Sequence, residues 1–300
     1  MIKKINKHFY KIVFISFGIA LLLISLPAFS SWTQNKEAFI FFPEDETVFF
    51  KHAKSSIELL NKKDDDEYVL NIAFASETNK PAFLRKDMSL LFENGTFVHA
   101  MKQSLKDQLF IEEVGTYDGE DSGRFDSITF HHAETHYSNE QINSKYTWSS
   151  DRLYVEDSPF SLLHSFHEPA DKNDEKDKEI LDSILTQQLT YELEGLLEEF
   201  QINGDYYHAF TLLDLPQYKE VALPGLTEKE TYASLGRIWE NLYRYYVLGI
   251  NTFTEETYSP LGNSIPHILL HKDGTHLLLL YETNDGTKQQ LLQLIQKLDS

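Results

Sequence analysis

The sequence of 300 residues predicts an α+β fold preceded by a membrane-crossing helix, and three observations carry this prediction. A long apolar segment follows a cluster of lysines at the N-terminus. Alternating apolar and polar residues, which are typical of half-buried strands, dominate the first half of the remaining chain. Two segments with helical spacing of apolar residues and a β-hairpin signal occupy the second half.

The N-terminal residues 1–31 have the composition of a signal peptide or a signal anchor. The fully charged side chains in this segment are all basic: Lys3, Lys4, Lys7 and Lys11. Such a cluster is costly to move through hydrocarbon, so it stays on the cytoplasmic side. Residues 12–29 are mostly apolar, and their length is at the short end of what spans a bilayer, about 17–25 residues. Small residues at Ala28 and Ser30 also fit a cleavage site.

Both alternatives place the rest of the chain outside the cytoplasm. An anchored chain is single-pass, has a cytoplasmic N-terminus and contacts the membrane through residues 12–29, whereas a cleaved chain is secreted. We interpret the remainder as a polar stalk over 32–36, a strand-rich region over 37–170 and a mixed helix and hairpin region over 171–300. Alkaline extraction of membranes followed by N-terminal sequencing distinguishes anchor from signal peptide.

Charge and cysteine content exclude several classes of function. The chain has 27 basic and 47 acidic side chains, a net charge of −20. A surface this acidic repels nucleic acid, so we expect no nucleic-acid partner. The absence of cysteine excludes disulfides, thiol nucleophiles and zinc–thiolate sites.

The first half of the exported region is predicted to be mostly strands. Residues 68–75 alternate apolar and polar side chains, and short strand ends are expected between 38 and 50. Asn94-Gly95 predicts a hairpin within residues 82–101, because both residues tolerate positive φ. Two further strands are predicted over 125–137 and 145–155.

The second half is predicted to contain two long helices around a hairpin. Thr227 and Glu230 have the spacing of a capping box, in which each side chain satisfies a free backbone donor of the other. In chain order, the elements predicted are a solvated linker over 171–179, a helix over 179–200, a strand over 207–213, a helix over 227–248, a hairpin over 265–281 and an amphipathic helix over 287–298.

The hairpin over 265–281 is predicted to be central to the C-terminal sheet. A turn at Asp273-Gly274 places Leu269 opposite Leu278 and Leu270 opposite Leu277. Apolar residues on both faces indicate a strand that is buried on both sides. We therefore expect the helices over 179–200 and 227–248 to cover the two faces.

A histidine-rich segment is the strongest candidate site in the sequence. If residues 130–136 form a strand, His132, Glu134 and His136 share one face in steps of about 7 Å. Two imidazoles and a carboxylate are typical zinc ligands where thiols are absent. The helical metalloprotease pattern needs glutamate directly after the first histidine, and Glu134 comes one position later. The sequence therefore predicts a zinc-type site without assigning it to that protease class.

The sequence carries no nucleophile elbow, phosphate-binding loop or dinucleotide-binding fingerprint. We therefore expect a membrane-anchored or secreted protein that acts as a non-enzymatic binding or accessory module of the bacterial cell envelope. The alternative is a metal-dependent binding protein or hydrolase that uses the predicted zinc site. The metal content of the purified protein separates the two hypotheses.

Overall fold

The computed structural model describes residues 39–62, 67–157, 162–250 and 257–297. The chain separates into two compact units, Met1–Ala38 and Phe39–Ser300, and the described residues belong to the second. The predicted membrane segment over 12–29 therefore lies outside the described residues. Among the helices that are described, none is long and apolar enough to cross a membrane.

The predicted α+β class is wrong. Strands make up 50% of the structure and helices 24%, and the strands form two sheets, one of them curved into a half-barrel. The strands are longer than the sequence predicted. The strand expected over 68–75 and the first strand of the expected hairpin are parts of one continuous strand over 68–93, and the second strand of that hairpin extends over 96–119. Backbone hydrogen bonds between neighbouring strands extend through polar stretches such as 102–108, where apolar and polar side chains do not alternate.

The first sheet has six strands and is antiparallel throughout. Its strands are β1 (Phe50–Lys62), β2 (Tyr68–Glu93), β3 (Thr96–Gly119), β4 (Gly123–His136), β5 (Ile142–Glu156) and β6 (His164–Phe166). The predicted hairpin joins β2 to β3, with φ of 46° at Asn94 and 86° at Gly95. The predicted strands over 125–137 and 145–155 are confirmed as β4 and β5.

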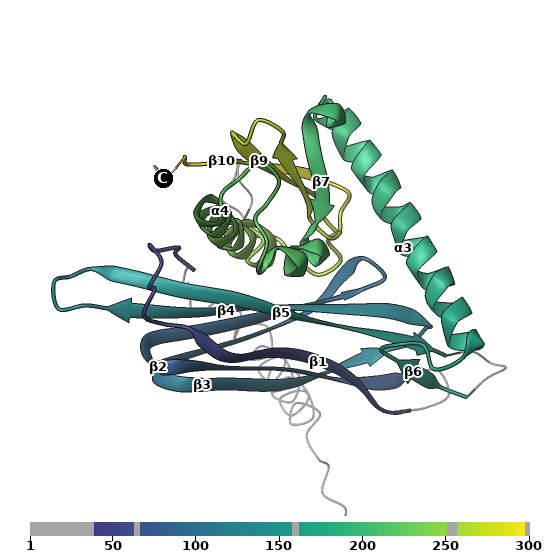
Figure 1. Cartoon of the computed structure of the whole chain (residues 1–300). Helices are drawn as coiled ribbons and strands as arrows, with labels where there is room; N and C mark the ends of the chain where they lie inside the picture. Colours follow the sequence, from purple (N-terminus) through teal and green to yellow (C-terminus); the bar gives the residue numbers. More distant parts are fainter. Residues whose placement is uncertain (1–38, 63–66, 158–161, 251–256, 298–300) are drawn as a thin grey trace, which may run out of the picture. The chain divides into compact units, whose positions relative to one another are not determined.

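Strand β2 changes partner along its length, and this curves the sheet. Its first part pairs with β1 as far as Thr78, and its second part pairs with β4 from Leu84 onward. The register with β3 shifts between Glu77 and Ala82, and such irregularities bend a strand. Because of this bend, β1 lies close to β5, and the backbone N–H of Ile57 donates a hydrogen bond to Asp151 at 2.8 Å. Figure 1 shows β1 running below β4 and β5.

The second sheet has the order β10-β9-β8-β7, so the predicted hairpin supplies its two central strands. The remaining elements are α3 (Lys172–Glu199), η1 (Gly204–Tyr206), β7 (Tyr207–Thr211), η2 (Leu212–Tyr218), α4 (Glu228–Asn241), the π-helix η3 (Leu242–Val247), β8 (His267–His271), β9 (His276–Glu282) and β10 (Lys288–Leu294). The predicted register is confirmed, with Leu269 opposite Leu278 and Leu270 opposite Leu277.

Two helices cover the faces of the second sheet, as predicted. Helix α4 begins with the capping box of Thr227 and Glu230, and it lies between the two sheets (Figure 1). Its buried Trp239 belongs to a hydrophobic core formed by residues of both sheets. Helix α3 covers the opposite face, where Leu196 packs with Leu269 and Leu278.

Two predicted elements of the second half are wrong. The stretch over 171–179 is not a linker but the first part of α3, because the Asp171 side chain accepts hydrogen bonds from two free N–H groups of the first turn. The predicted helix over 287–298 is strand β10, which pairs with β9 from Lys288 to Leu294.

Candidate functional site

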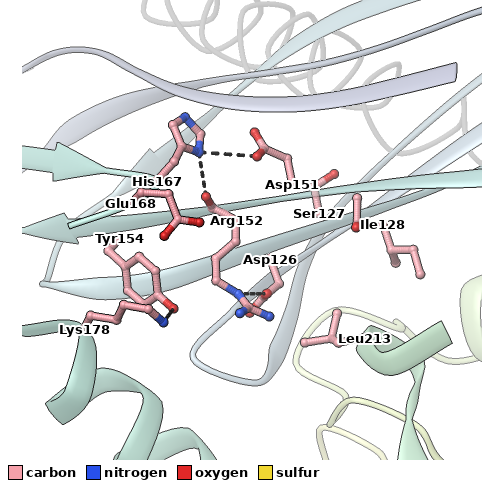
Figure 2. A pocket seen from close by; sticks show the side chains of 11 residues that line it. Asp126, Ser127, Ile128, Asp151, Arg152, Tyr154, His167, Glu168, Lys178 and Leu213 are labelled. Atoms are coloured by element: carbon pink, nitrogen blue, oxygen red, sulfur yellow. Dashed lines mark hydrogen bonds and ion pairs between the residues drawn. The ribbon is translucent and has the colours of Figure 1, made fainter. Parts of the chain in front are cut away.

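A polar pocket of about 330 Å³ lies where β4 and β5 meet β6, α3 and η2 (Figure 2). This volume falls at the lower end of small-molecule sites, about 300–1,000 Å³. The lining residues come from strands, a loop, helix α3 and the 3-10 helix η2, which are far apart in the sequence: Asp126, Ser127, Ile128, Ser150, Asp151, Arg152, Tyr154, His167, Glu168, Lys178 and Leu213.

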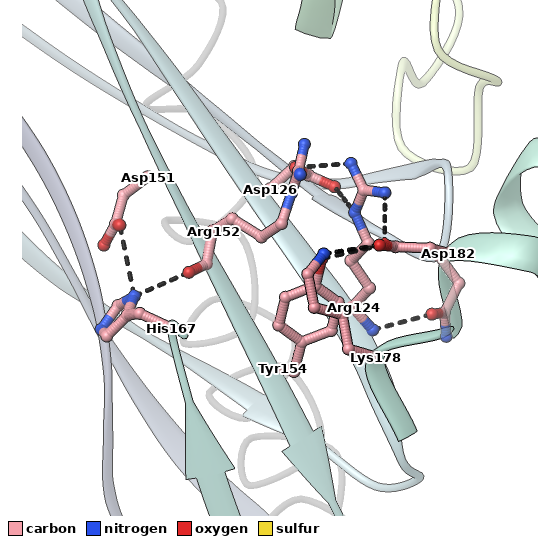
Figure 3. Close-up of polar contacts among 9 residues, drawn as sticks. Arg124, Asp126, Asp151, Arg152, Tyr154, His167, Lys178 and Asp182 are labelled. Atoms are coloured by element: carbon pink, nitrogen blue, oxygen red, sulfur yellow. Dashed lines mark hydrogen bonds and ion pairs between the residues drawn. The ribbon is translucent and has the colours of Figure 1, made fainter. Parts of the chain in front are cut away.

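An alternating chain of cations and anions, which we call the cationic wall, reaches the pocket through Asp126, Arg152 and Lys178 (Figure 3). The Arg152 Nε donates to Asp126 Oδ1 at 2.7 Å. Arg124 donates to the other oxygen of Asp126 at 2.8 Å and to Asp182 at 2.8 Å. Lys178 donates to Asp182 at 2.6 Å. Three cations therefore alternate with two carboxylates, which leaves one positive charge in excess.

The electrostatics of the cationic wall keep these groups charged. Burial acts to lower the pKa of Arg152, but the charge and hydrogen bond of Asp126 outweigh it and raise that pKa. Burial acts in the same direction on Lys178, and hydrogen bonds with Asp182 and Tyr154 raise its pKa. Burial acts to raise the pKa of Asp182, yet the hydrogen bonds from Lys178 and Tyr154 lower it. The Arg152 side chain stays 40% exposed.

Another part of the pocket lining, which we call the anionic wall, carries Asp151, Glu168 and His167. His167 Nδ1 lies 2.6 Å from the backbone carbonyl of Arg152 and 3.3 Å from Asp151 Oδ1. A carbonyl only accepts hydrogen bonds, so we assign the proton to Nδ1, which leaves Nε2 as an acceptor in the neutral ring. Asp151 is itself held by the backbone N–H of Ile57.

The two walls together suit a ligand that carries both charges. The N–H groups of Arg152 that its protein partners leave unused can donate hydrogen bonds to a carboxylate. The carboxylates of Asp151 and Glu168, with the His167 acceptor, offer partners to an ammonium group. Sequence reasoning missed this site, although Asp126 and Arg152 face each other as directly opposed residues of β4 and β5. Opposite charges at directly opposed positions of two strands are a recognisable signal, but they can be found only when the pairing register of β4 and β5 is known.

The three residues of the predicted zinc site lie on β4, away from this pocket. Glu134 Oε1 is 3.9 Å from His132 Nδ1, and Glu134 Oε2 is 3.6 Å from His136 Nε2. Lys86 Nζ also lies 3.6 Å from Glu134 Oε1, and His136 stacks on Phe83. No group of three or more His, Asp and Glu side chains in the described part of the chain is arranged to hold a metal ion. Metal binding by this trio stays a prediction.

His132 is buried among aromatic rings instead of facing water. Its ring lies 5.8 Å from that of Phe39 and 5.9 Å from that of Phe130. Burial, with the nearby charges of Lys86 and Arg85, lowers the pKa of His132 to about 3. The imidazole is therefore neutral in the folded protein at any pH above this value.

We expect His132 to make the protein less stable in mild acid. The unfolded chain binds a proton at His132 near the ordinary pKa of 6.5, whereas the folded chain does not until about pH 3. Stability is therefore complete above pH 6.5 and is lost as the pH falls toward 3. Urea unfolding at pH 7.5 and 5.5 should show a loss about 1.4 kcal/mol larger in the wild type than in His132→Phe. Equal losses in both proteins would show that His132 does not titrate in this way.

A hydrogen-bonded relay of Asp87, His131 and Ser149 lies inside the half-barrel. Asp87 Oδ2 is 2.6 Å from His131 Nδ1, and His131 Nε2 is 2.8 Å from the Ser149 hydroxyl. This is the bonding order of a serine-hydrolase triad. Asp87 and His131 have no exposed surface, however, and the Ser149 hydroxyl is shared with Ser55 at 2.8 Å. We therefore assign the relay to stability, as a polar network that fills the half-barrel.

The comparisons with known proteins leave the function open. No protein-family model, no curated protein and no solved structure matches this chain. A functional hypothesis for this chain therefore rests on its own sequence and on the chemistry of its pocket.

Proposed function

We propose that this chain is a non-enzymatic, extracytoplasmic binding module of the bacterial cell envelope and that its pocket takes a small zwitterionic ligand. An amino acid or the end of a short peptide has the required pair of charges. The observation that carries the proposal is that one pocket of about 330 Å³ is lined by the cations Arg152 and Lys178 and by the carboxylates of Asp151 and Glu168. The N-terminal sequence supports export, because its lysines precede an apolar segment.

In this proposal, each charged group of the ligand has a partner among the pocket residues. Asp126 is nearly buried and fixes two guanidiniums at once, so the exposed Arg152 is held in place before a carboxylate arrives. A held donor loses little conformational freedom on binding, which favours affinity. Glu168 and Asp151, which also line the pocket, would compensate the ammonium group of the same ligand (Figure 2).

We expect alanyl-alanine to bind, and both of its charges to contribute. Acetylation of its amine, or amidation of its carboxylate, should each weaken binding at least about tenfold, or 1.4 kcal/mol. The substitution Arg152→Gln should weaken alanyl-alanine to the same extent and leave the amidated peptide unchanged, because that peptide has no carboxylate. Isothermal titration calorimetry measures all of these affinities.

Two further variants complete the experiment. Glu168→Gln should remove the preference for the free amine over the acetylated amine. Lys51→Gln is the control, since it removes one cation from an exposed ion pair on β1 while leaving the pocket untouched. An Arg152→Gln variant that still distinguishes the free acid from the amide would refute the proposed role of the cationic wall. Failure of the free peptide to bind at about 10 mM, a concentration that detects dissociation constants in the millimolar range, would refute the proposed ligand class.

A further inference from the structure

Among the described residues, strand β10 is an edge strand, and after Lys288 at its start it lacks the usual protection. It ends the order of the second sheet and pairs with β9 over seven consecutive residues with no register shift (Figure 1). Open edges are usually blunted by charged side chains, proline or bulges, because their free N–H and C=O groups bind other strands. The segment 289–296 contains only glutamine, leucine and isoleucine. In a chain with 25% charged residues, this edge is unusually neutral.

The outward face of β10 exposes two neighbouring leucines. Leu292 is 61% exposed and Leu294 is 69% exposed. The inward face is held by α4, where Gln293 Nε2 donates to the Ser234 carbonyl at 2.9 Å and Gln293 Oε1 accepts from Asn241 at 3.1 Å. The strand is therefore fixed in an extended form, with two leucines in water beside an open edge.

The sequence of this edge is symmetric about Gln293. On either side stand Leu292 and Leu294, then Leu291 and Ile295, then Gln290 and Gln296. When two copies of a strand pair antiparallel about a twofold axis, each residue meets its mirror position in the other copy. The symmetry therefore pairs leucine with leucine on the outer face, leucine with isoleucine on the inner face, and glutamine with glutamine.

We propose that the partner of this edge is a second copy of the same chain, joined by antiparallel pairing of the two β10 strands about Gln293. The two four-stranded sheets then form one continuous sheet across the twofold axis. Each Leu292 packs against Leu294 of the second copy, which covers the four exposed leucines. A contact of two short strands is small, so we expect a dimer with a dissociation constant in the micromolar range.

Charge gives the dimer a distinctive salt dependence. Each chain carries a net charge of −20, while the proposed contact itself is neutral. Repulsion between the two copies is long-range and is screened by salt, with a Debye length of about 10 Å at 0.1 M. Raising the salt concentration should therefore strengthen the dimer, whereas an interface built on ion pairs would weaken.

Cysteine cross-linking tests the register directly, because the full chain has no cysteine of its own. Leu292→Cys and Leu294→Cys are made as separate proteins and oxidised alone or mixed. Directly opposed strand residues have Cβ atoms about 4.5–5.5 Å apart, whereas diagonal ones are farther than a disulfide allows. We expect disulfide-linked dimers in the mixture and at least about fivefold fewer in either protein alone, given this distance difference. Equal cross-linking in all three samples would overturn the register.

Sedimentation of the full-length wild-type protein in detergent tests the dimer itself. Leu292→Lys should raise the dissociation constant at least about a hundredfold, because it brings two buried charges to the contact. Ile184→Lys is the matched control, since Ile184 is 53% exposed on α3 and lies outside the contact. A wild-type protein that stays monomeric at about 100 µM in about 0.5 M salt would overturn the proposal, because this salt screens the repulsion. A Leu292→Lys protein that dimerises like the wild type would also overturn it.

Discussion

Replacing Asp87 by alanine is expected to lower the free energy of unfolding by about 3–5 kcal/mol. Asp87 lies at the centre of the polar network inside the half-barrel, and neither Asp87 nor Arg85 has exposed surface. The guanidinium of Arg85 lies 3.8 Å from Asp87, and His131 lies 2.6 Å from it. Removing the carboxylate leaves a buried cation without its counter-charge, which costs far more than the loss of a surface pair. Urea unfolding at pH 7 measures the difference.

A surface ion pair on the same strand provides the control for this experiment. Glu77 lies on β2 and contacts Lys51 at 3.0 Å, with both side chains more than one-third exposed. Because solvent screens this pair, Glu77→Gln should cost less than about 1 kcal/mol. In the double variant Asp87→Ala with His131→Ala, the two costs should not add, since both residues belong to one network. A loss for Asp87→Ala as small as that for Glu77→Gln would show that the network does not stabilise the half-barrel.

A chain that ends at Ser264 is expected to aggregate rather than fold. The deletion removes β8, β9 and β10, and with them Ile268, Leu270 and Leu279 of the core shared by both sheets. Helix α4 would then lose its apolar cover from the second sheet and the contacts of Ser234 and Asn241 with Gln293 of β10. Burying a large apolar side chain contributes about 1.5–3 kcal/mol, so the loss of many such contacts exceeds the stability of an ordinary domain. Size-exclusion chromatography and thermal unfolding measure the outcome. A soluble fragment with a cooperative transition would mean that the hairpin is peripheral.

Local chemistry explains the predictions that the structure confirms. The Asn94-Gly95 turn and the Thr227 capping box depend on residues within four positions of each other. The register of the hairpin over 265–281 follows from its short turn at Asp273-Gly274, because a short turn fixes which residues of the two strands lie opposite each other. In each case the favourable backbone conformation is decided before any distant segment packs against it.

The elements that were predicted wrongly depend on distant partners. Leu291, Leu294 and Ile295 have helical spacing, yet this segment pairs with β9 and exposes Leu294. The charged stretch over 171–179 looked like a solvated linker, and the cap at Asp171 made it helical. Spacing alone does not separate a helix from a strand in such short segments, because sheet pairing overrides weak local preferences.

By itself, the sequence determined the turns, the helix cap, the hairpin register and the basic, apolar character of the N-terminus. Only the tertiary structure decided the long curved strands, the network around Asp87 and the two charged walls around Arg152 and Glu168. These sites combine residues from strands and a helix that meet only after the sheet bends. The physical reason is that hydrogen bonds between strands depend on pairing over long sequence separations, which no local pattern of side chains encodes.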